Sequence, residues 1–214
     1  MKRLASIISC WVIFLLMSPQ SRAADLDGLV SSLKDGGYVI VFRHGATDDS
    51  QKDVYPFVFD DMTKQRQLSE QGRQMARDIG AALKTLGIPL GQIYTSQLHR
   101  AVETGSLISG SQTIAKGELT DSSAGSASAM GKPTGANAKV GEAIRSLVNA
   151  APKSATNNVL ITHKTNIADA FGKEFGNVID GEALVLKPNP AGAPTFVDRV
   201  QPKEWIEYAG RPRS

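Results

Sequence analysis

Cysteine is almost absent from this chain of 214 residues, and its one copy, Cys10, lies close to the N-terminus. The first residues are typical of an export signal. Two basic residues precede a mostly apolar stretch at 4–17. Ser21 and Ala23 are small residues at the two positions that a signal peptidase recognises before its cleavage site. We therefore expect cleavage after Ala23, which would leave the exported protein without cysteine. That absence excludes disulfides, a thiolate nucleophile and cysteine-bound metal ions.

Long apolar runs are absent as well. The stretch 4–17 is shorter than the roughly 20 residues that a membrane-spanning helix needs, so an uncleaved anchor is the second interpretation. We expect residues 1–23 to be a signal peptide of a periplasmic or secreted protein, with no stable membrane insertion after cleavage. Residues 24–214 are enough for a single domain with a sizeable core.

An excess of charge is also missing once the signal is removed. The signal holds three of the 24 basic residues and none of the 21 acidic residues, so 21 of each sign remain. The basic isoelectric point of the whole chain therefore belongs largely to the signal, and it gives no support for nucleic-acid binding. The sequence indicates no particular oligomeric state.

Helices and strands are predicted to alternate along the rest of the chain. Apolar spacing and turn residues predict helices near 25–34, 69–86, 98–108, 140–148 and 166–171, and strands near 38–42, 93–96, 113–115, 159–162, 182–187 and 195–200. The segments 47–67 and 110–138 show no sustained period, and we interpret the first as a long loop over the ligand site. The alternation predicts an α/β fold, a three-layer α/β/α sandwich with a mostly parallel central sheet.

Three predicted strands end in residues suited to bind an anion. The first runs into Arg43, His44 and Gly45, the second is followed by Arg100 at a helix start, and the third is followed by His163. Because the carboxyl ends of parallel strands lie at one edge of a sheet, we expect these side chains to meet there. Two arginines and two imidazoles beside a helix N-terminus predict a site for a phosphoryl group.

These segments resemble the histidine phosphatase superfamily, also called phosphoglycerate-mutase-like. The resemblance rests on Arg43-His44-Gly45 with Thr47, on Tyr-Thr-Ser-Gln-Leu-His-Arg-Ala-Val-Glu-Thr at 94–104, and on Val-Leu-Ile-Thr-His at 159–163. The segment 68–73 also resembles the usual start of the helix that follows the first motif. The blocks occur in the order that the family has, and the resemblance implies a phosphoglycerate-mutase-like fold for one domain over residues 24–214.

The resemblance implies a role for each matching residue. His44 would be the nucleophile that forms a phosphohistidine, which water then hydrolyses. Arg43 and Arg100 would hold the equatorial oxygens, and His163 would donate a hydrogen bond to the same group. His44 must be neutral, with one ring nitrogen free and the other held by a hydrogen bond. We expect no metal and no cofactor. Further contacts to the substrate are expected from Gly45, Thr47 and Lys164.

The general acid that protonates the leaving oxygen is less clearly indicated. One branch of the family has a glutamate two residues beyond a leucine, and Asp121 takes that place after Leu119. Another branch has an aspartate directly after the second histidine, where this chain has Lys164, a poor proton donor in place of a carboxylic acid. We favour Asp121; the alternatives are Glu118, Asp48 and Glu182.

Several functional interpretations follow from this pattern. We expect an exported phosphatase that hydrolyses a small phosphomonoester, and a mutase is less favoured. The alternative is a non-catalytic phosphate-binding or regulatory module that keeps the pocket but lacks the proton donor. A zinc hydrolase, with His44, His163 and a carboxylate as ligands, is disfavoured because the arginines would repel the cation. We expect His99 to be solvated.

Overall fold

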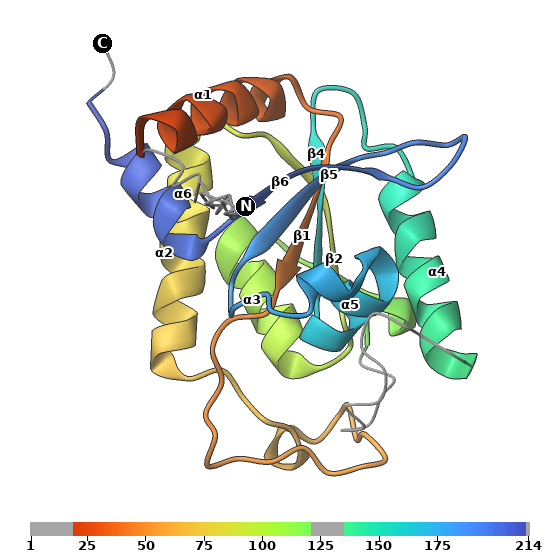
Figure 1. Cartoon of the computed structure of the whole chain (residues 1–214). Coiled ribbons are helices and arrows are strands. Elements are labelled where there is room, and N and C mark those ends of the chain that lie inside the picture. The colour runs from red at the N-terminus through yellow and green to blue at the C-terminus, as the bar shows by residue number, and fades with distance from the viewer. Residues whose placement is uncertain (1–18, 121–134, 213–214) are drawn as a thin grey trace, which may run out of the picture.

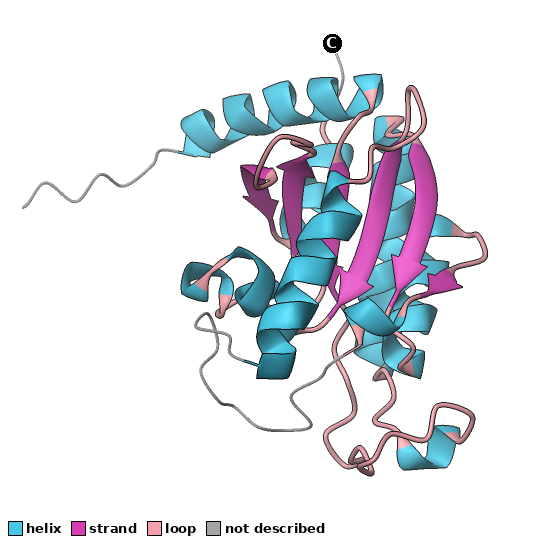
Figure 2. Ribbon diagram, turned by 90° about the vertical axis from the view of Figure 1, so that its right-hand side faces the viewer, coloured by secondary structure: helices cyan, strands magenta, loops and turns pink. Residues whose placement is uncertain are grey.

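The computed structural model describes residues 19–120 and 135–212, and its centre is a six-stranded sheet between two layers of helices (Figure 1, Figure 2). The helices are α1 (Pro19–Asp35), α2 (Glu70–Leu86), α3 (His99–Ser109), α4 (Gly135–Asn149), α5 (Lys164–Phe171) and α6 (Pro202–Ala209). The strands are β1 (Val39–Arg43), β2 (Leu90–Thr95), β3 (Ile114–Ala115), β4 (Asn157–Thr162), β5 (Ala183–Lys187) and β6 (Thr195–Val200).

The sheet has the order β3-β2-β4-β1-β5-β6, and its first four strands run parallel. β5 is antiparallel to β1, and β6 is antiparallel to β5. Side chains of a strand point alternately to the two faces, so β1 contributes to both halves of the core. Ile40 and Phe42 pack with α1, α2, α3 and α6, whereas Val39 and Val41 pack with α4 and α5. The predicted α/β/α sandwich with a mostly parallel sheet is confirmed.

The register of the central strands brings three strand ends together. Arg43 of β1 pairs with Thr162 of β4, and Thr95 of β2 pairs with Ile161 of the same strand. Beyond the strands, the backbone N–H of His44 still donates to the carbonyl of Thr162 at 3.1 Å. The residues that follow β1, β2 and β4 therefore lie side by side at one edge of the sheet.

Both ends of the described chain differ from the sequence-based expectation. α1 begins at Pro19 instead of near residue 25, so it runs across the expected cleavage point after Ala23. Its polar first turn shows no apolar period that would predict a helix. In the structure, Arg22 of this turn forms ion pairs with Asp198 and Glu204, near the C-terminus. α6 was not predicted, since eight residues are too few for a clear period, although Trp205 in it is buried.

Among the described residues, no helix is both long and apolar enough to cross a membrane.

Candidate active site

His44 follows β1 directly and is 3% exposed. Its Nδ1 lies 2.8 Å from the carbonyl oxygen of Gly45, which can only accept a hydrogen bond. The ring proton therefore belongs on Nδ1, and Nε2 keeps a lone pair. This arrangement supplies the fixed, neutral imidazole that a nitrogen nucleophile requires. The sequence could not name the partner, because it is the backbone of the next residue.

The turn after His44 is held by a close approach of two backbone segments. α2 begins after Ser69, whose hydroxyl accepts from the N–H of Gly72 at 3.0 Å, as the predicted N-cap does. Gly72 lies against Ala46, and a Cβ at Gly72 would come within 2.0 Å of the Ala46 carbonyl oxygen. Only glycine fits there, which explains a glycine inside the first turn of this helix.

His163 follows β4 and is 2% exposed. Its Nε2 lies 2.8 Å from the hydroxyl oxygen of Ser96, the residue after β2. That hydroxyl accepts from the N–H of Leu98 at 3.1 Å, and its own proton faces two acceptors, Nε2 of His163 at 2.8 Å and the Thr120 hydroxyl oxygen at 3.5 Å. The shorter distance favours donation to His163. Nε2 of His163 is then the acceptor and Nδ1 carries the ring proton. The two imidazoles meet edge to face, with ring centroids 5.1 Å apart.

Arg43 is held by the loop that precedes β5. Its Nη1 donates to the carbonyl of Val178 at 2.8 Å, and its Nη2 pairs with Asp180 at 2.6 Å. Glu182, buried at the end of this loop, accepts the N–H of Ile179 at 2.7 Å and braces the turn. Both terminal nitrogens of Arg43 therefore bind groups of this loop. The remaining nitrogen, Nε, takes no part in these contacts.

Arg100 lies in the first turn of α3 and is 2% exposed. Thr104, one turn later, donates to the Arg100 carbonyl at 2.7 Å, and its hydroxyl oxygen accepts the N–H of Gly45 at 3.1 Å. This hydroxyl links α3 to the turn after His44. The Nη1 of Arg100 donates to Asp53 at 2.9 Å, so a carboxylate of the 47–67 loop reaches the site.

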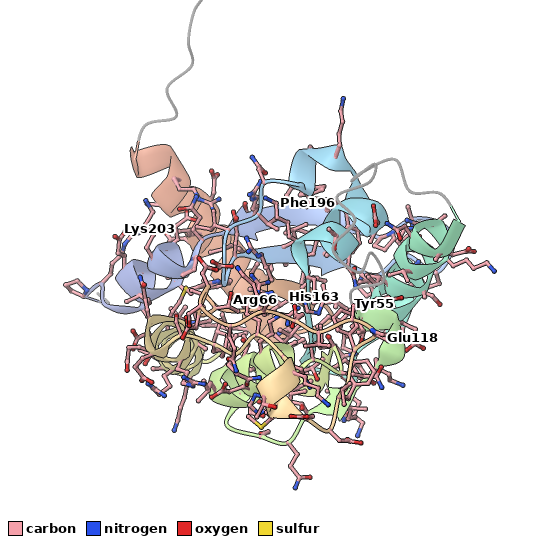
Figure 3. The ribbon with its side chains drawn as sticks, turned by 90° about the horizontal axis from the view of Figure 1, so that it is seen from below. Tyr55, Arg66, Glu118, His163, Phe196 and Lys203 are labelled. Atoms are coloured by element: carbon pink, nitrogen blue, oxygen red, sulfur yellow. The ribbon has the colours of Figure 1, made fainter. Side chains whose placement is uncertain are left out.

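A third arginine, Arg66, joins the site without having been predicted. It lies at the end of the 47–67 loop, where the sequence shows no motif, and its charge is one cause of the lowered pKa values of Arg43 and His163. Its backbone N–H donates to Asp53 at 2.9 Å, the same oxygen that Arg100 contacts. Figure 3 shows Arg66 and His163 in the view onto this edge of the sheet.

Within the described ranges, the buried nitrogens that lack a hydrogen-bond partner include Nε of Arg43, Nε of Arg66 and Nδ1 of His163. Buried donors are rarely left unpaired, because each loses its hydration without compensation. Two are guanidinium N–H groups and the third carries the imidazole proton, so all three suit an anion with several oxygens. The geometry fits a bound phosphoryl group.

The electrostatics keep both imidazoles neutral. Burial lowers the pKa of His44 well below its usual range, and the neighbouring His163 and Arg100 lower it further. Burial likewise lowers the pKa of His163, with added effects of Arg100, Arg66 and Arg43. At neutral pH both imidazoles are therefore unprotonated, while the arginines supply the positive charge.

The sequence around these residues matches the model of a known protein family. Residues 39–139 match the sequence model of the histidine phosphatase superfamily, branch 1. The chain resembles this superfamily over that range. The matched range includes Arg43, His44 and Arg100, and His163 lies beyond it on the same sheet edge. The predicted resemblance is confirmed.

Solved structures of known proteins resemble this chain in fold. The protein histidine phosphatase SixA complexed with tungstate has a TM-score of 0.53 and 19% identity, covering 78% of this chain and 97% of that chain. A phosphoserine phosphatase mutant from Entamoeba histolytica in complex with phosphoserine has a TM-score of 0.54 and 13% identity, covering 78% and 98%. Mycobacterial hydrolase 1 has a TM-score of 0.51 and 20% identity, covering 74% and 94%. The sequence matches no curated protein.

The remaining predicted substrate contacts follow His44 and His163 closely in the sequence. Gly45 is buried in the turn after His44, and Thr47 forms an isolated bridge with Leu68 where the long loop leaves the sheet. Lys164 is the first residue of α5 and is half-buried directly after His163. Nothing in these positions conflicts with a contact to substrate.

The alternative proton donors lie in different surroundings. Asp121 falls outside the described residues, and Glu118 is exposed in the short helix η2 (Gly117–Leu119). Asp48 is fully exposed, and hydrogen bonds from Ser50 lower its pKa, which disfavours proton donation. Glu182 is buried and its carboxylate is paired with Arg199, so it braces the loop that holds Arg43.

The side chain of His99, expected to be solvated, is 32% exposed and also contacts the 47–67 loop. Its Nδ1 lies 2.7 Å from Oε1 of Gln67, and its backbone N–H donates to Oε1 of Gln65 at 2.9 Å. His99 therefore fastens the 47–67 loop to the start of α3. Sequence patterns could not reveal this contact because it joins a helix to a loop without a period.

Within the described parts of the chain, no three His, Cys, Asp or Glu side chains lie close enough to hold a metal ion. The charged groups gathered around His44 and His163 are mainly arginines, which suit an anion rather than a cation.

Proposed function

We propose that this chain is a phosphatase that hydrolyses phosphomonoesters through a phosphohistidine on His44. The observation that carries the proposal is the hydrogen bond of His44 Nδ1 to Gly45 O, since it leaves the lone pair on Nε2 of an imidazole that packs against His163, whose Nδ1 is a buried, unpartnered donor. The match of residues 39–139 to the histidine phosphatase superfamily supports the reaction class. The names of two structural neighbours, which include tungstate and phosphoserine, support phosphate oxyanions as the ligand class.

In the first step, Nε2 of His44 attacks phosphorus and forms the N–P bond while the bond from phosphorus to the alcohol oxygen breaks. Nε of Arg43, Nε of Arg66 and Nδ1 of His163 donate to the equatorial oxygens, where negative charge must be stabilised. The departing alcohol oxygen takes a proton from a carboxylic acid. In the second step, water attacks phosphorus, its proton passes to the same carboxylate, and the lone pair returns to Nε2.

Asp121 is our proposal for that acid. Leu119 directly precedes Thr120, and its carbonyl accepts from Thr162 at 2.8 Å and from Asn166 at 3.1 Å. The Thr120 hydroxyl oxygen accepts the N–H of Gln97 at 3.0 Å and lies 3.5 Å from Ser96, the partner of His163. The chain therefore reaches position 121 from a firmly attached point beside the site.

The decisive experiment uses p-nitrophenyl phosphate with the wild type, His44→Ala and the control Phe196→Ser. We expect hydrolysis that falls by at least about 10³-fold in His44→Ala and stays unchanged in Phe196→Ser. Brief exposure to ³²P-labelled substrate should yield an acid-labile phosphoenzyme that His44→Ala lacks. Phosphate binding without turnover would instead support the non-catalytic module.

Two further parts of the proposal concern the metal and the location. We propose turnover without a metal ion, so dialysis against a chelator should leave the rate unchanged. We also propose export, on the basis of residues 1–23. Cell fractionation followed by N-terminal sequencing of the recovered protein tests it, and recovery only from the cytosol would contradict it.

A further inference from the structure

The 47–67 loop exposes a cluster of apolar side chains. Five large ones lie within nine residues: Val54, Tyr55, Val58, Phe59 and Met62, exposed by 47%, 65%, 37%, 39% and 48%. We call these five residues the apolar loop patch. Single exposed apolar residues are ordinary on protein surfaces, but five within one short loop suggest a contact surface.

The patch belongs to a loop with a defined shape. The rings of Tyr55 and Phe57 lie 5.7 Å apart, and those of Phe57 and Phe59 lie 6.1 Å apart. Gln65, whose side chain is fully buried, donates from Nε2 to the carbonyls of Val58 and Phe59, each at 2.9 Å. The patch is therefore supported from beneath by polar contacts, and its apolar side chains are left facing outward.

The same contacts join the patch to the phosphate site. Oε1 of Gln65 accepts the N–H of His99, the residue before Arg100. Asp53, which immediately precedes the patch, accepts from Nη1 of Arg100 at 2.9 Å. Two residues of chain span at most about 7 Å, so the backbone of Tyr55 lies within that distance of the backbone of Asp53. In Figure 3, Tyr55 is seen between His163 and Glu118.

This position is where the alcohol portion of a bound phosphomonoester would leave the site. The phosphoryl group occupies the buried donors, and the rest of the substrate must extend outward past the loop that covers Arg100. An apolar alcohol would bury its surface against the patch, which is favourable in proportion to the area removed from water. The loop also carries five acidic residues against three basic ones, which opposes alcohols with further negative charge and anionic membrane surfaces.

We propose that the apolar loop patch binds the alcohol portion of the substrate, and that this histidine phosphatase prefers phosphomonoesters of apolar alcohols. The proposal rests on the proposed function, because it concerns the substrate of that same site. It assigns a specificity role to Tyr55 and Phe59, and it leaves the phosphoryl chemistry to His44 and the arginines.

A series of n-alkyl phosphates tests the preference, because ethyl, butyl and hexyl alcohols leave with nearly equal chemical ease. We expect kcat/KM of the wild type to rise about tenfold or more from ethyl to hexyl phosphate, as partial burial of four methylene groups would produce. The double variant Tyr55→Ser, Phe59→Ser should lose most of that rise. The matched control is Phe196→Ser, whose ring is 45% exposed on β6 and should keep the rise.

The outcomes separate this inference from the function on which it rests. Equal kcat/KM for ethyl and hexyl phosphate in the wild type overturns the apolar preference and leaves the phosphatase assignment intact. A rise that persists in the double variant overturns the role of the patch. Failure to hydrolyse any of the esters overturns the proposed function itself. Equal rates together with Tyr55-dependent sedimentation on phosphatidylcholine vesicles would show a membrane-binding surface and would contradict the inference.

Discussion

The carboxylate of Asp53 accepts a hydrogen bond from Nη1 of Arg100 at 2.9 Å, and the same oxygen accepts the backbone N–H of Arg66 at 2.9 Å. One side chain of the long loop thus orients an arginine on α3 and fixes the segment that carries another. Because Arg100 is 2% exposed, its orientation depends on such protein contacts more than on water. Asp53 is therefore a positioning residue for the phosphate site.

Removal of this carboxylate should impair phosphate binding. We expect Asp53→Ala to lower kcat/KM for p-nitrophenyl phosphate by about 10- to 100-fold, since a buried charge loses its partner. Asp53→Asn keeps an acceptor oxygen and should lose less, and Asp60→Ala, an exposed acid of the same loop, should lose nothing. Steady-state kinetics and the inhibition constant of tungstate measure these effects. A gain of activity in Asp53→Ala would show instead that the carboxylate competes with phosphate.

Ser96 should control the tautomer of His163. Its hydroxyl proton, donated to Nε2, keeps the imidazole proton on Nδ1, where it can reach the substrate. We expect Ser96→Ala to lower kcat about tenfold and, because the buried N–H of Leu98 loses its acceptor, to lower the melting temperature as well. ¹⁵N NMR of the imidazole should show Nδ1–H in the wild type and a mixture of tautomers in the variant. An unchanged tautomer in the variant would contradict this role.

Both buried histidines should stay neutral below pH 6.5. Their pKa values in the folded protein are lowered by burial and nearby positive charge, so the unfolded chain binds more protons as pH falls below about 6.5. The stability that these groups contribute is fully present above that pH and is lost progressively as pH falls toward their folded pKa values. NMR titration should show two ring signals, identified with His44→Ala and His163→Ala, that do not shift between pH 8 and 6.

The pH dependence of the activity should likewise show that His44 stays neutral. For kcat/KM, no loss between pH 7.5 and 6.5 should arise from protonation of His44. A limb near pH 6 would belong to the second ionisation of the phosphoester, which lies at about 6. Repeating the profile with an ester of different phosphate pKa distinguishes the two, because only a substrate limb would move.

A methyl group at Gly72 should disturb the turn after His44. The added Cβ would meet the Ala46 carbonyl oxygen at 2.0 Å. A Cβ is fixed by the helix backbone and the oxygen belongs to the backbone of the turn, so neither atom can rotate away. We expect Gly72→Ala to destabilise the fold by about 2–3 kcal/mol and to reduce activity. The control Gly28→Ala, also in a helix, meets nothing within 4 Å and should be neutral or slightly stabilising. Thermal unfolding with parallel kinetics tests the pair.

Arg22 should stabilise the N-terminal helix wherever it is retained. Nε donates to Glu204 at 2.7 Å, Nη1 to Asp198 at 2.8 Å, and Nη2 to the carbonyl of Arg199 at 2.8 Å. Its side chain is 27% exposed, so solvent weakens these pairs, and we expect about 1 kcal/mol in total.

A chain that begins at Pro19 should therefore melt about 2–4 °C above one that begins at Ala24. Arg22→Gln in the longer chain should remove the difference, and equal melting temperatures would contradict the role of Arg22.

The sequence by itself determined the sheet, the family and four of the central side chains. Strand periods and helix caps are local, so Arg43, His44 and His163 could be placed at strand ends and Arg100 at a helix start. A parallel sheet then required the ends to share an edge. The mostly parallel sandwich could be predicted from the alternation of helices and strands. Each helix or strand pattern depends only on residues that are close in the sequence.

Only the tertiary structure decided how those side chains are oriented and what surrounds them. Asp53 and Arg66 come from a loop without a period, and their contacts to α3 depend on how the whole loop folds back. Which ring nitrogen of His44 keeps its lone pair depends on the backbone carbonyl of Gly45. Which ring nitrogen of His163 carries the proton depends on the hydroxyl of Ser96, the residue after β2. Such choices follow from hydrogen bonds between distant segments, for which neither propensity nor spacing carries a signal.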